Sequence, residues 1–321
     1  MKNSTESNFI KSPINYTGNK FRILDQIQSF FPKKIKTMVD LCCGGGTVGI
    51  NTNAKKVIFI DNSKQLINLL KYLYKNNYET VLEKILRCIN KYKLSCSFEN
   101  GFKFYKNKIQ EPNSNNGLKK YNSKNYYKLR QDYNSLAKKD TEEAMIMLYV
   151  LLVYSFNNDL RFSKNGDFNL PIGKTDFNNV MASKLKKFIN STSKKKYLFI
   201  CSDFNSKVTL NWLKKADFVY IDPPYLITTA TYNETNKWDN ETEYNLLRLI
   251  DFFIEKNIKF VLSNVLEKKG KRNEPLYFWS ESNKKIKCFD IDYNYRSSSY
   301  NKIDRDSMER EVIFTNAADT K

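Results

Sequence analysis

The segment Asp222-Pro223-Pro224-Tyr225 combines residue types that could bind and activate an amino group. The aspartate accepts hydrogen bonds, and the consecutive prolines stiffen the turn and lack N–H groups, which leaves nearby carbonyls free as acceptors. An acceptor-only pocket suits an exocyclic amino group, which carries two N–H donors. The ring of Tyr225 offers a face on which a planar base can stack. The alternative interpretation is a Pro-rich turn whose aspartate caps a helix.

A glycine-rich segment near the N-terminus could bind a second ligand. Asp40 opens the run Asp-Leu-Cys-Cys-Gly-Gly-Gly, which contains Gly44 and ends at Gly46. Glycines let a backbone approach a ligand closely, and an acid roughly 20 residues later, here Asp61, can hold two ribose hydroxyls. The segment has neither the lysine of a phosphate-binding loop nor the full glycine spacing of a dinucleotide site. The pattern favours an adenosine-type ligand without a pyrophosphate.

These segments follow short apolar stretches that alternate with helical patterns, which is typical of a doubly wound α/β sheet. Ligands of such sheets bind at the carboxyl ends of the strands, so the two segments are expected at one edge. We expect strands at Thr37–Leu41, Val57–Ile60, Tyr197–Cys201, Phe218–Ile221 and Phe260–Leu262, and a hairpin from Phe289–Arg296 and Arg310–Phe314. Helices are expected at Phe21–Phe31, from Val48, after Asn62 or Ser63, and at Tyr244–Ile254.

Residues 76–190 interrupt this alternation. Glu142–Phe156 is apolar enough for a buried helix, and Asn157–Lys174 has Gly166 between two short segments, which indicates a β-hairpin. We therefore expect an insertion with its own small fold between two parts of the sheet.

Composition narrows the classes of function. The 321 residues include no histidine, which excludes histidine triads, histidine acid–base catalysis and histidine zinc sites. Six cysteines form no CxxC pair, so we expect no metal site and a reduced, cytoplasmic setting. No apolar run is long enough for a membrane span, and residues 1–12 lack the apolar core of a signal peptide. The net charge of +20 attracts polyanions, so nucleic acid is the first partner to test, although the codon usage of an AT-rich genome could explain part of it.

Five segments, in order along nearly the whole chain, resemble the Dam-type (D12 class, alpha group) S-adenosylmethionine-dependent DNA adenine-N6 methyltransferases. Asn15–Lys20 resembles the N-terminal K-W-x-G-G-K motif, and Asp40–Gly46 resembles the cofactor loop. Asn157–Gly173 resembles the target-recognition hairpin, and Asp222–Tyr225 resembles the DPPY motif. The fifth segment, Arg296-Ser297 with Glu311–Asn316, resembles the C-terminal end of the family.

The resemblance implies a fold and an activity. The fold is a Rossmann-like methyltransferase sheet with helices on both faces, plus an inserted, mainly helical target-recognition domain with a β-hairpin. Residues 1–75 and 191–321 would form the catalytic domain, and residues 76–190 the insertion. The activity is transfer of a methyl group from S-adenosylmethionine to the N6 amino group of adenine within a short double-stranded DNA sequence. It would proceed by base flipping and direct in-line attack, in a restriction–modification system or in phage or host DNA modification.

The resemblance also implies a role for each site residue. The catalytic set is Asp222, Pro223, Pro224 and Tyr225, with the Asp222 side chain and the Pro223 carbonyl accepting from the target amino group and Tyr225 stacking on the flipped adenine. Tyr16 and Lys20 would hold the methionine end of the cofactor, Asp61 its ribose, and Asp203 with Phe204 its adenine. The cofactor site is completed by Asp40, Gly44, Gly46 and Asp222. The DNA-binding set is Asn15, Asn157, Arg161 and Asn169.

Several choices stay open at this point. Asn15 stands where GATC-specific members carry a lysine that reads guanine, so GATC is in doubt as the recognition sequence. Arg161 is expected to contact guanine in the major groove, with a surface salt bridge as the alternative. Double-stranded DNA is the expected partner, a cognate restriction endonuclease is an open second one, and the chain would be a monomer or weak dimer. The alternative functions are amino methylation of RNA or of a protein glutamine, and a catalytically silent DNA-binding subunit.

Overall fold

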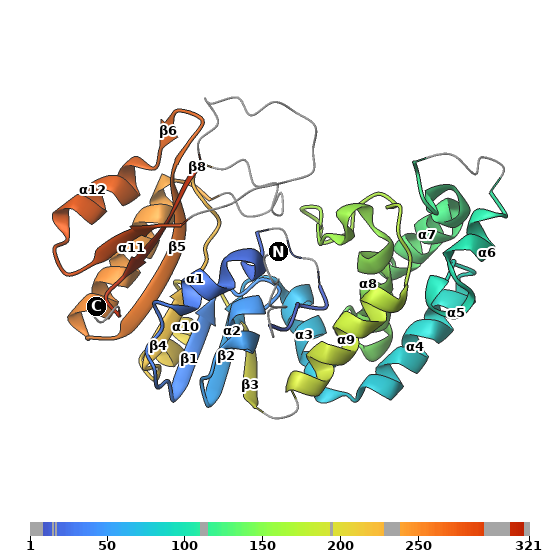
Figure 1. Cartoon of the computed structure of the whole chain (residues 1–321), viewed down its shortest axis with the longest axis horizontal. Coiled ribbons are helices and arrows are strands. Elements are labelled where there is room, and N and C mark those ends of the chain that lie inside the picture. The colour runs from blue at the N-terminus through green and yellow to red at the C-terminus, as the bar shows by residue number, and fades with distance from the viewer. Residues whose placement is uncertain are drawn as a thin grey trace, which may run out of the picture.

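The computed structural model describes residues 9–14, 16, 18–109, 115–192, 195–227, 238–291 and 309–317. It is a mixed α/β fold whose central, mostly parallel sheet is flanked by helices (Figure 1). The strands lie in the order β3-β2-β1-β4-β5-β8-β7, and the short β6 pairs with β5.

All five strands expected before the C-terminal hairpin are present and parallel. They are β1 (Thr37–Leu41), β2 (Lys56–Asp61), β3 (Lys196–Cys201), β4 (Phe218–Ile221) and β5 (Lys259–Lys268). β5 runs six residues beyond the expected end at Leu262 because it also pairs with β6 (Lys271–Arg272) and β8 (Glu309–Thr315). β7 (Lys287–Asp290) pairs antiparallel with β8, which confirms the C-terminal hairpin up to Ile291. Arg296 and Ser297 lie outside the described residues.

Alternate residues of the strands pack into two separate apolar cores, one on each face of the sheet. In β2, Val57 and Phe59 belong to one core, whereas Ile58 and Ile60 belong to the other. This period of two is that of a strand whose two faces are both covered. The second core is closed by α10 (Lys207–Leu213), α11 (Asn240–Glu255) and α12 (Glu274–Ser282), each capped by a side chain, Ser206, Asp239 and Asn273 respectively.

The first core contains the N-terminal helices and extends into the helices between β2 and β3. α1 (Leu24–Gln28, after a 3-10 turn at Phe21–Ile23), α2 (Thr47–Asn51) and α3 (Lys64–Lys75) pack there. The chain continues as α4 (Tyr78–Lys91), α5 (Ser97–Asn100), α6 (Phe102–Lys106), α7 (Lys119–Asn134), α8 (Glu142–Tyr154) and α9 (Asn179–Thr192), which stand beside the sheet in Figure 1. α8 is buried at every position from Ala144 to Tyr154, as its composition predicts. Within the described part of the chain, no helix combines the length and apolarity that crossing a membrane requires.

The segment after α8 doubles back on itself, but the expected β-hairpin is reduced to two isolated antiparallel bridges. Ser155 pairs with Ile172 and Phe162 with Phe168, and Gly166 turns the chain with φ +80°. Between the two bridges the chain forms a 3-10 turn at Phe156–Asn158, in which Asn157 and Asn158 have positive φ, and Pro171 has no N–H to donate, so the ladder is interrupted. Hydrogen bonds to α7 hold the segment in place instead. The Asn134 side chain accepts from the N–H of Phe168 and donates to its carbonyl oxygen.

Candidate active site

A cavity of about 840 Å³ opens at the carboxyl ends of β1, β2, β3 and β4. Its volume is in the range of small-molecule sites. Thirteen of the residues predicted from the sequence line it: Tyr16, Lys20, Asp40, Gly44, Asp61, Asn157, Arg161, Asp203, Phe204, Asp222, Pro223, Pro224 and Tyr225. Gly46 and Asn169 are not among the lining residues, and Asn15 is outside the described residues. The topology thus brings together segments that are scattered over the sequence.

The glycine-rich turn after β1 is held in a conformation that requires glycine. Gly44 has φ +49°, and a Cβ atom added there would lie 2.7 Å from Cδ1 of Tyr16. The ring of Tyr16 therefore packs directly on the glycine backbone. Gly46, with φ +70°, begins α2. These contacts seat the N-terminal segment on the turn and form one wall of the cavity.

Two buried carboxylates brace this turn. Asp61, at the end of β2, accepts from the N–H of Gly44 at 3.0 Å and from the N–H of Ser63 at 2.9 Å. Asp40 accepts from the N–H of Gly49 at 2.9 Å. Burial raises the pKa of both carboxyls, and these backbone hydrogen bonds oppose the shift. Asp61 is thereby aimed at the cavity next to the glycine backbone, where a ribose could be held.

Aromatic side chains also line the cavity. Phe204 follows β3 and is buried, whereas the neighbouring Asp203 is exposed and accepts from the N–H of Asn205 at 2.8 Å. The ring of Trp238 lies 5.5 Å from the ring of Phe204 and also lines the cavity. An apolar face beside a carboxylate is suited to an adenine, which presents a flat ring and an amino group.

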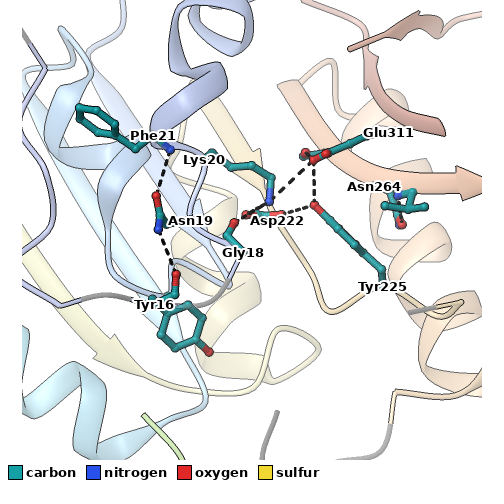
Figure 2. Close-up of polar contacts among 12 residues, drawn as sticks. Tyr16, Gly18, Asn19, Lys20, Phe21, Asp222, Tyr225, Asn264 and Glu311 are labelled. Carbon is teal, nitrogen blue, oxygen red and sulfur yellow. Dashed lines mark hydrogen bonds and ion pairs between the residues drawn. The ribbon is translucent and has the colours of Figure 1, made fainter. Parts of the chain in front are cut away.

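Lys20 and Asp222 meet at the centre of the site. Lys20 is only 3% exposed, and its Nζ lies 2.8 Å from Oδ2 of Asp222 and 2.9 Å from the carbonyl oxygen of Gly18 (Figure 2). The hydroxyl of Tyr225 donates to Oδ1 of Asp222 at 2.9 Å. Both oxygens of Asp222 thus accept from the protein, and each keeps a further lone pair for another donor.

Glu311, in β8, is a second carboxylate of this cluster. Its Oε1 lies 3.3 Å from the Tyr225 hydroxyl oxygen, as a more distant second acceptor for the one hydrogen that Asp222 also accepts, and 3.9 Å from Nζ of Lys20 (Figure 2). Burial, followed by the charges of Asp222 and Glu311, raises the pKa of Tyr225 well above its usual value. Tyr225 therefore remains a neutral hydrogen-bond donor at neutral pH.

Two of the four residues predicted to bind DNA, Asn157 and Arg161, line the cavity. Asn157 has φ +57°. Nε of Arg161 donates to Oδ1 of Asn169 at 2.8 Å, so Asn169 orients the guanidinium. The partner of Arg161 in this contact is an amide rather than a carboxylate, and its contact with guanine stays a prediction.

The sequence reasoning did not assign Glu311 or Trp238 to the site. The sequence holds one clue to Glu311, a charged residue directly before the apolar run of β8. In the structure it is only 7% exposed. The sequence holds no such clue to Trp238, since its place at the cavity depends on how the start of α11 lies against the end of β3.

Comparison with known sequences decides the family. Residues 16–295 match the sequence model of the D12 class N6 adenine-specific DNA methyltransferases, which is most of the chain. This chain belongs to that family. Membership confirms the predicted family; the match covers the second, third and fourth of the five motifs and most of the first, and the fifth lies beyond residue 295. A methyltransferase of this class requires a methyl donor.

Individual relatives agree with this assignment. The chain is 37% identical to the type II methyltransferase M.FokI of Planomicrobium okeanokoites and 34% identical to the modification methylase StsI of Streptococcus sanguinis, in each case over 98% of its own length. It spans only 44% of the length of either relative. The DNA adenine methylase of Escherichia coli K12 is 24% identical over 78% of this chain and 79% of that relative.

Proposed function

We propose that this D12 methyltransferase transfers a methyl group from S-adenosylmethionine to N6 of adenine in double-stranded DNA. The observation that carries the proposal is the single cavity that joins the glycine-rich turn and Asp61 to Asp222 and Tyr225. One ligand can therefore reach from the nucleoside-binding wall to the amino-group acceptor. RNA and protein glutamine are less favoured substrates, because the family and the relatives named above are DNA methylases.

The chemistry of the donor set fits S-adenosylmethionine. Asp61 would accept from the ribose hydroxyls, Phe204 would contact the adenine, and Asp203 would accept from its amino group. Lys20 is the cation predicted to hold the methionine carboxylate, and its Nζ has three donors, of which the contacts to Asp222 and Gly18 use two. When bound, this cofactor supplies an electrophilic methyl group on a positively charged sulfur.

Asp222 would activate the target amino group by accepting one of its N–H bonds, and the carbonyl of Pro223 would accept the other. Holding both hydrogens on acceptors resists delocalisation of the nitrogen lone pair into the ring. The lone pair would then be available for in-line attack on the methyl carbon as the C–S bond breaks and S-adenosylhomocysteine leaves. The proton lost by the methylated nitrogen would pass to Asp222 or to water, so neither a covalent enzyme intermediate nor a histidine base is required. Because Lys20 and Tyr225 fix both oxygens of Asp222, its carboxylate is oriented before the base arrives.

The target adenine would reach this pocket by flipping out of the duplex and stacking on Tyr225. We propose that residues 76–190 are the target-recognition domain and that residues 1–75 and 191–321 are the catalytic domain. The support is the placement of Arg161 and Asn157 at the cavity, with Asn169 orienting Arg161. The names of the first two relatives, a type II methyltransferase and a modification methylase, support a role in a restriction–modification system.

The direct test is transfer of a radiolabelled methyl group from S-adenosylmethionine to duplex DNA, followed by identification of the modified base. N6-methyladenine at a defined sequence is the expected product. Single-stranded RNA and a glutamine-containing peptide are assayed in parallel, and transfer to either of these instead of DNA contradicts the proposal. Binding to DNA without transfer would identify the silent DNA-binding subunit instead.

A further inference from the structure

Glu243 is a buried carboxylate that takes no part in the chemistry proposed above. It lies in the first turn of α11 and is 0% exposed. Its oxygens accept from three N–H donors: Nε1 of Trp238 at 2.5 Å, Nδ2 of Asn273 at 2.8 Å and Nδ2 of Asn264 at 3.3 Å. Because all three partners donate, the position requires an acceptor-only group, which a carboxylate supplies.

Two of these donors belong to rigid elements. Asn264 lies in β5, and Asn273 caps α12 by accepting from the N–H of Leu276. Both are 0% exposed. Burial raises the pKa of Glu243, and the hydrogen bonds from Trp238, Asn273 and Asn264 oppose the shift. The carboxylate of Glu243 thus links α11 to β5 and α12 through hydrogen bonds, and it also accepts the hydrogen bond of the Trp238 indole.

Trp238 lines the cavity. It is half-buried, and it lies against Phe204 with 5.5 Å between ring centroids and 38° between ring planes. That separation leaves no room for a third ring between the two. The aromatic pair therefore forms one continuous apolar wall rather than a slot.

We propose that Trp238 and Phe204 together form the wall on which the adenine of S-adenosylmethionine lies, and that Glu243 is the positioning residue that holds the indole in place. This inference rests on the proposed function, since it takes S-adenosylmethionine as the occupant of the cavity. It adds a residue that touches the cofactor, Trp238, and a residue that acts through it, Glu243.

Replacement of Trp238 tests the contact. Trp238→Ala should raise the Kd for S-adenosylmethionine by about 5- to 160-fold, the range expected for the loss of a base–aromatic contact. Calorimetry should show the same factor for S-adenosylhomocysteine and 5′-methylthioadenosine, because all three share the adenosine. Unchanged Kd values, or a loss confined to the two ligands with an amino-acid end, overturn the proposal. A raised KM for DNA with unchanged cofactor Kd also overturns it, since the indole would then face DNA.

Replacement of Glu243 tests the positioning role. Glu243→Gln places an NH₂ group among N–H donors and should raise the cofactor Kd by about 3- to 10-fold. In a Trp238→Phe background it should have no further effect, because the phenyl ring has no N–H to hold. Equal effects in both backgrounds mean that Glu243 acts only on the general fold, which overturns its assignment. Glu241→Gln, an exposed change in the same turn, is the matched control.

Fluorescence gives a readout that does not depend on methyl transfer. The chain has three tryptophans, so a Trp212→Phe, Trp279→Phe variant retains only Trp238. Its emission should change on titration with S-adenosylmethionine, and Glu243→Gln should shift the emission of the ligand-free protein. No change at saturating cofactor contradicts the inference. A wild-type protein that binds the cofactor but methylates no DNA would refute the proposed function and leave this inference standing.

Discussion

Lys20 and Asp222 are 202 residues apart in the chain, yet Nζ and Oδ2 lie 2.8 Å apart in the centre of the site. The pair joins the N-terminal segment to the carboxyl end of β4. The carboxylate of Asp222 is therefore already oriented, and under the proposed function the pair would link cofactor binding to the activation of the target base.

Asp222→Asn should reduce methyl transfer by on the order of 10²–10³-fold, as for the loss of one pre-oriented polar group in an active site. The amide keeps the shape of the side chain but replaces one acceptor oxygen with a donor, which must then face Lys20 or Tyr225, themselves donors. Single-turnover rates measure the loss, and calorimetry should still detect cofactor binding. Asp140→Asn, at an exposed position, serves as control. A variant that keeps most of its rate rules out the acceptor mechanism.

Lys20→Met should lower the free energy of unfolding by about 1–3 kcal/mol. It leaves Asp222, which is 19% exposed, without its cation and beside the carboxylate of Glu311. Adding Asp222→Asn to the Lys20→Met variant should restore part of this stability, since the uncompensated charge is removed. Urea unfolding of the three variants measures the coupling. Strictly additive losses would show that the ion pair contributes nothing to folding.

The sequence predicted the frame of the site but not its side-chain contacts. Apolar stretches with polar ends located β1 to β4, and the glycine run located the turn that Tyr16 covers, because both depend on local residue types. The Lys20–Asp222 pair depends on how β4 lies beside β1, which no local pattern encodes. The hairpin at Asn157–Lys174 was overestimated for the opposite reason. Gly166 does turn the chain, but the 3-10 turn at Phe156–Asn158 and the missing N–H of Pro171 leave only two isolated bridges.

Asp61→Ala should weaken binding of S-adenosylmethionine by roughly 1.5–3 kcal/mol, the range for hydrogen bonds to charged groups. The change removes the proposed ribose acceptor and also the bond that holds the N–H of Gly44. Calorimetry with S-adenosylmethionine and with methionine separates the two ends of the ligand. Affinity for S-adenosylmethionine should fall, and unchanged affinity would remove Asp61 from the cofactor site. Thermal unfolding checks that the turn is still folded.

Asp40→Asn should become more favourable for stability, relative to wild type, as pH rises above the unfolded pKa of about 3.9. Burial raises the pKa of Asp40 in the folded protein above the unfolded value of about 3.9. The folded state therefore binds this proton more tightly, and its contribution to stability is lost as pH rises through the folded pKa. Asparagine does not titrate, so the variant escapes this loss. Urea unfolding at several pH values measures the difference, and a difference that is constant or falls with pH contradicts the assignment.

Arg161→Ala should cost roughly 1–3 kcal/mol of binding on the true recognition site and relax the choice at one base pair. The reason is the fork of donors that matches O6 and N7 of guanine, here oriented by Asn169. The recognition site must first be found by sequencing modified bases. Affinities are then measured on that site and on single-mismatch sites.

Lys119→Ala is the control that distinguishes loss of a phosphate contact from loss of base reading in Arg161→Ala. Lys119 is exposed at the start of α7, where a lysine can contact phosphate without reading sequence. Its loss should weaken binding to all sequences alike and lower the salt slope by about one. If Arg161→Ala also lowers every affinity equally at two salt concentrations, Arg161 binds phosphate or supports the fold. Base reading would then have to come from other residues between 76 and 190.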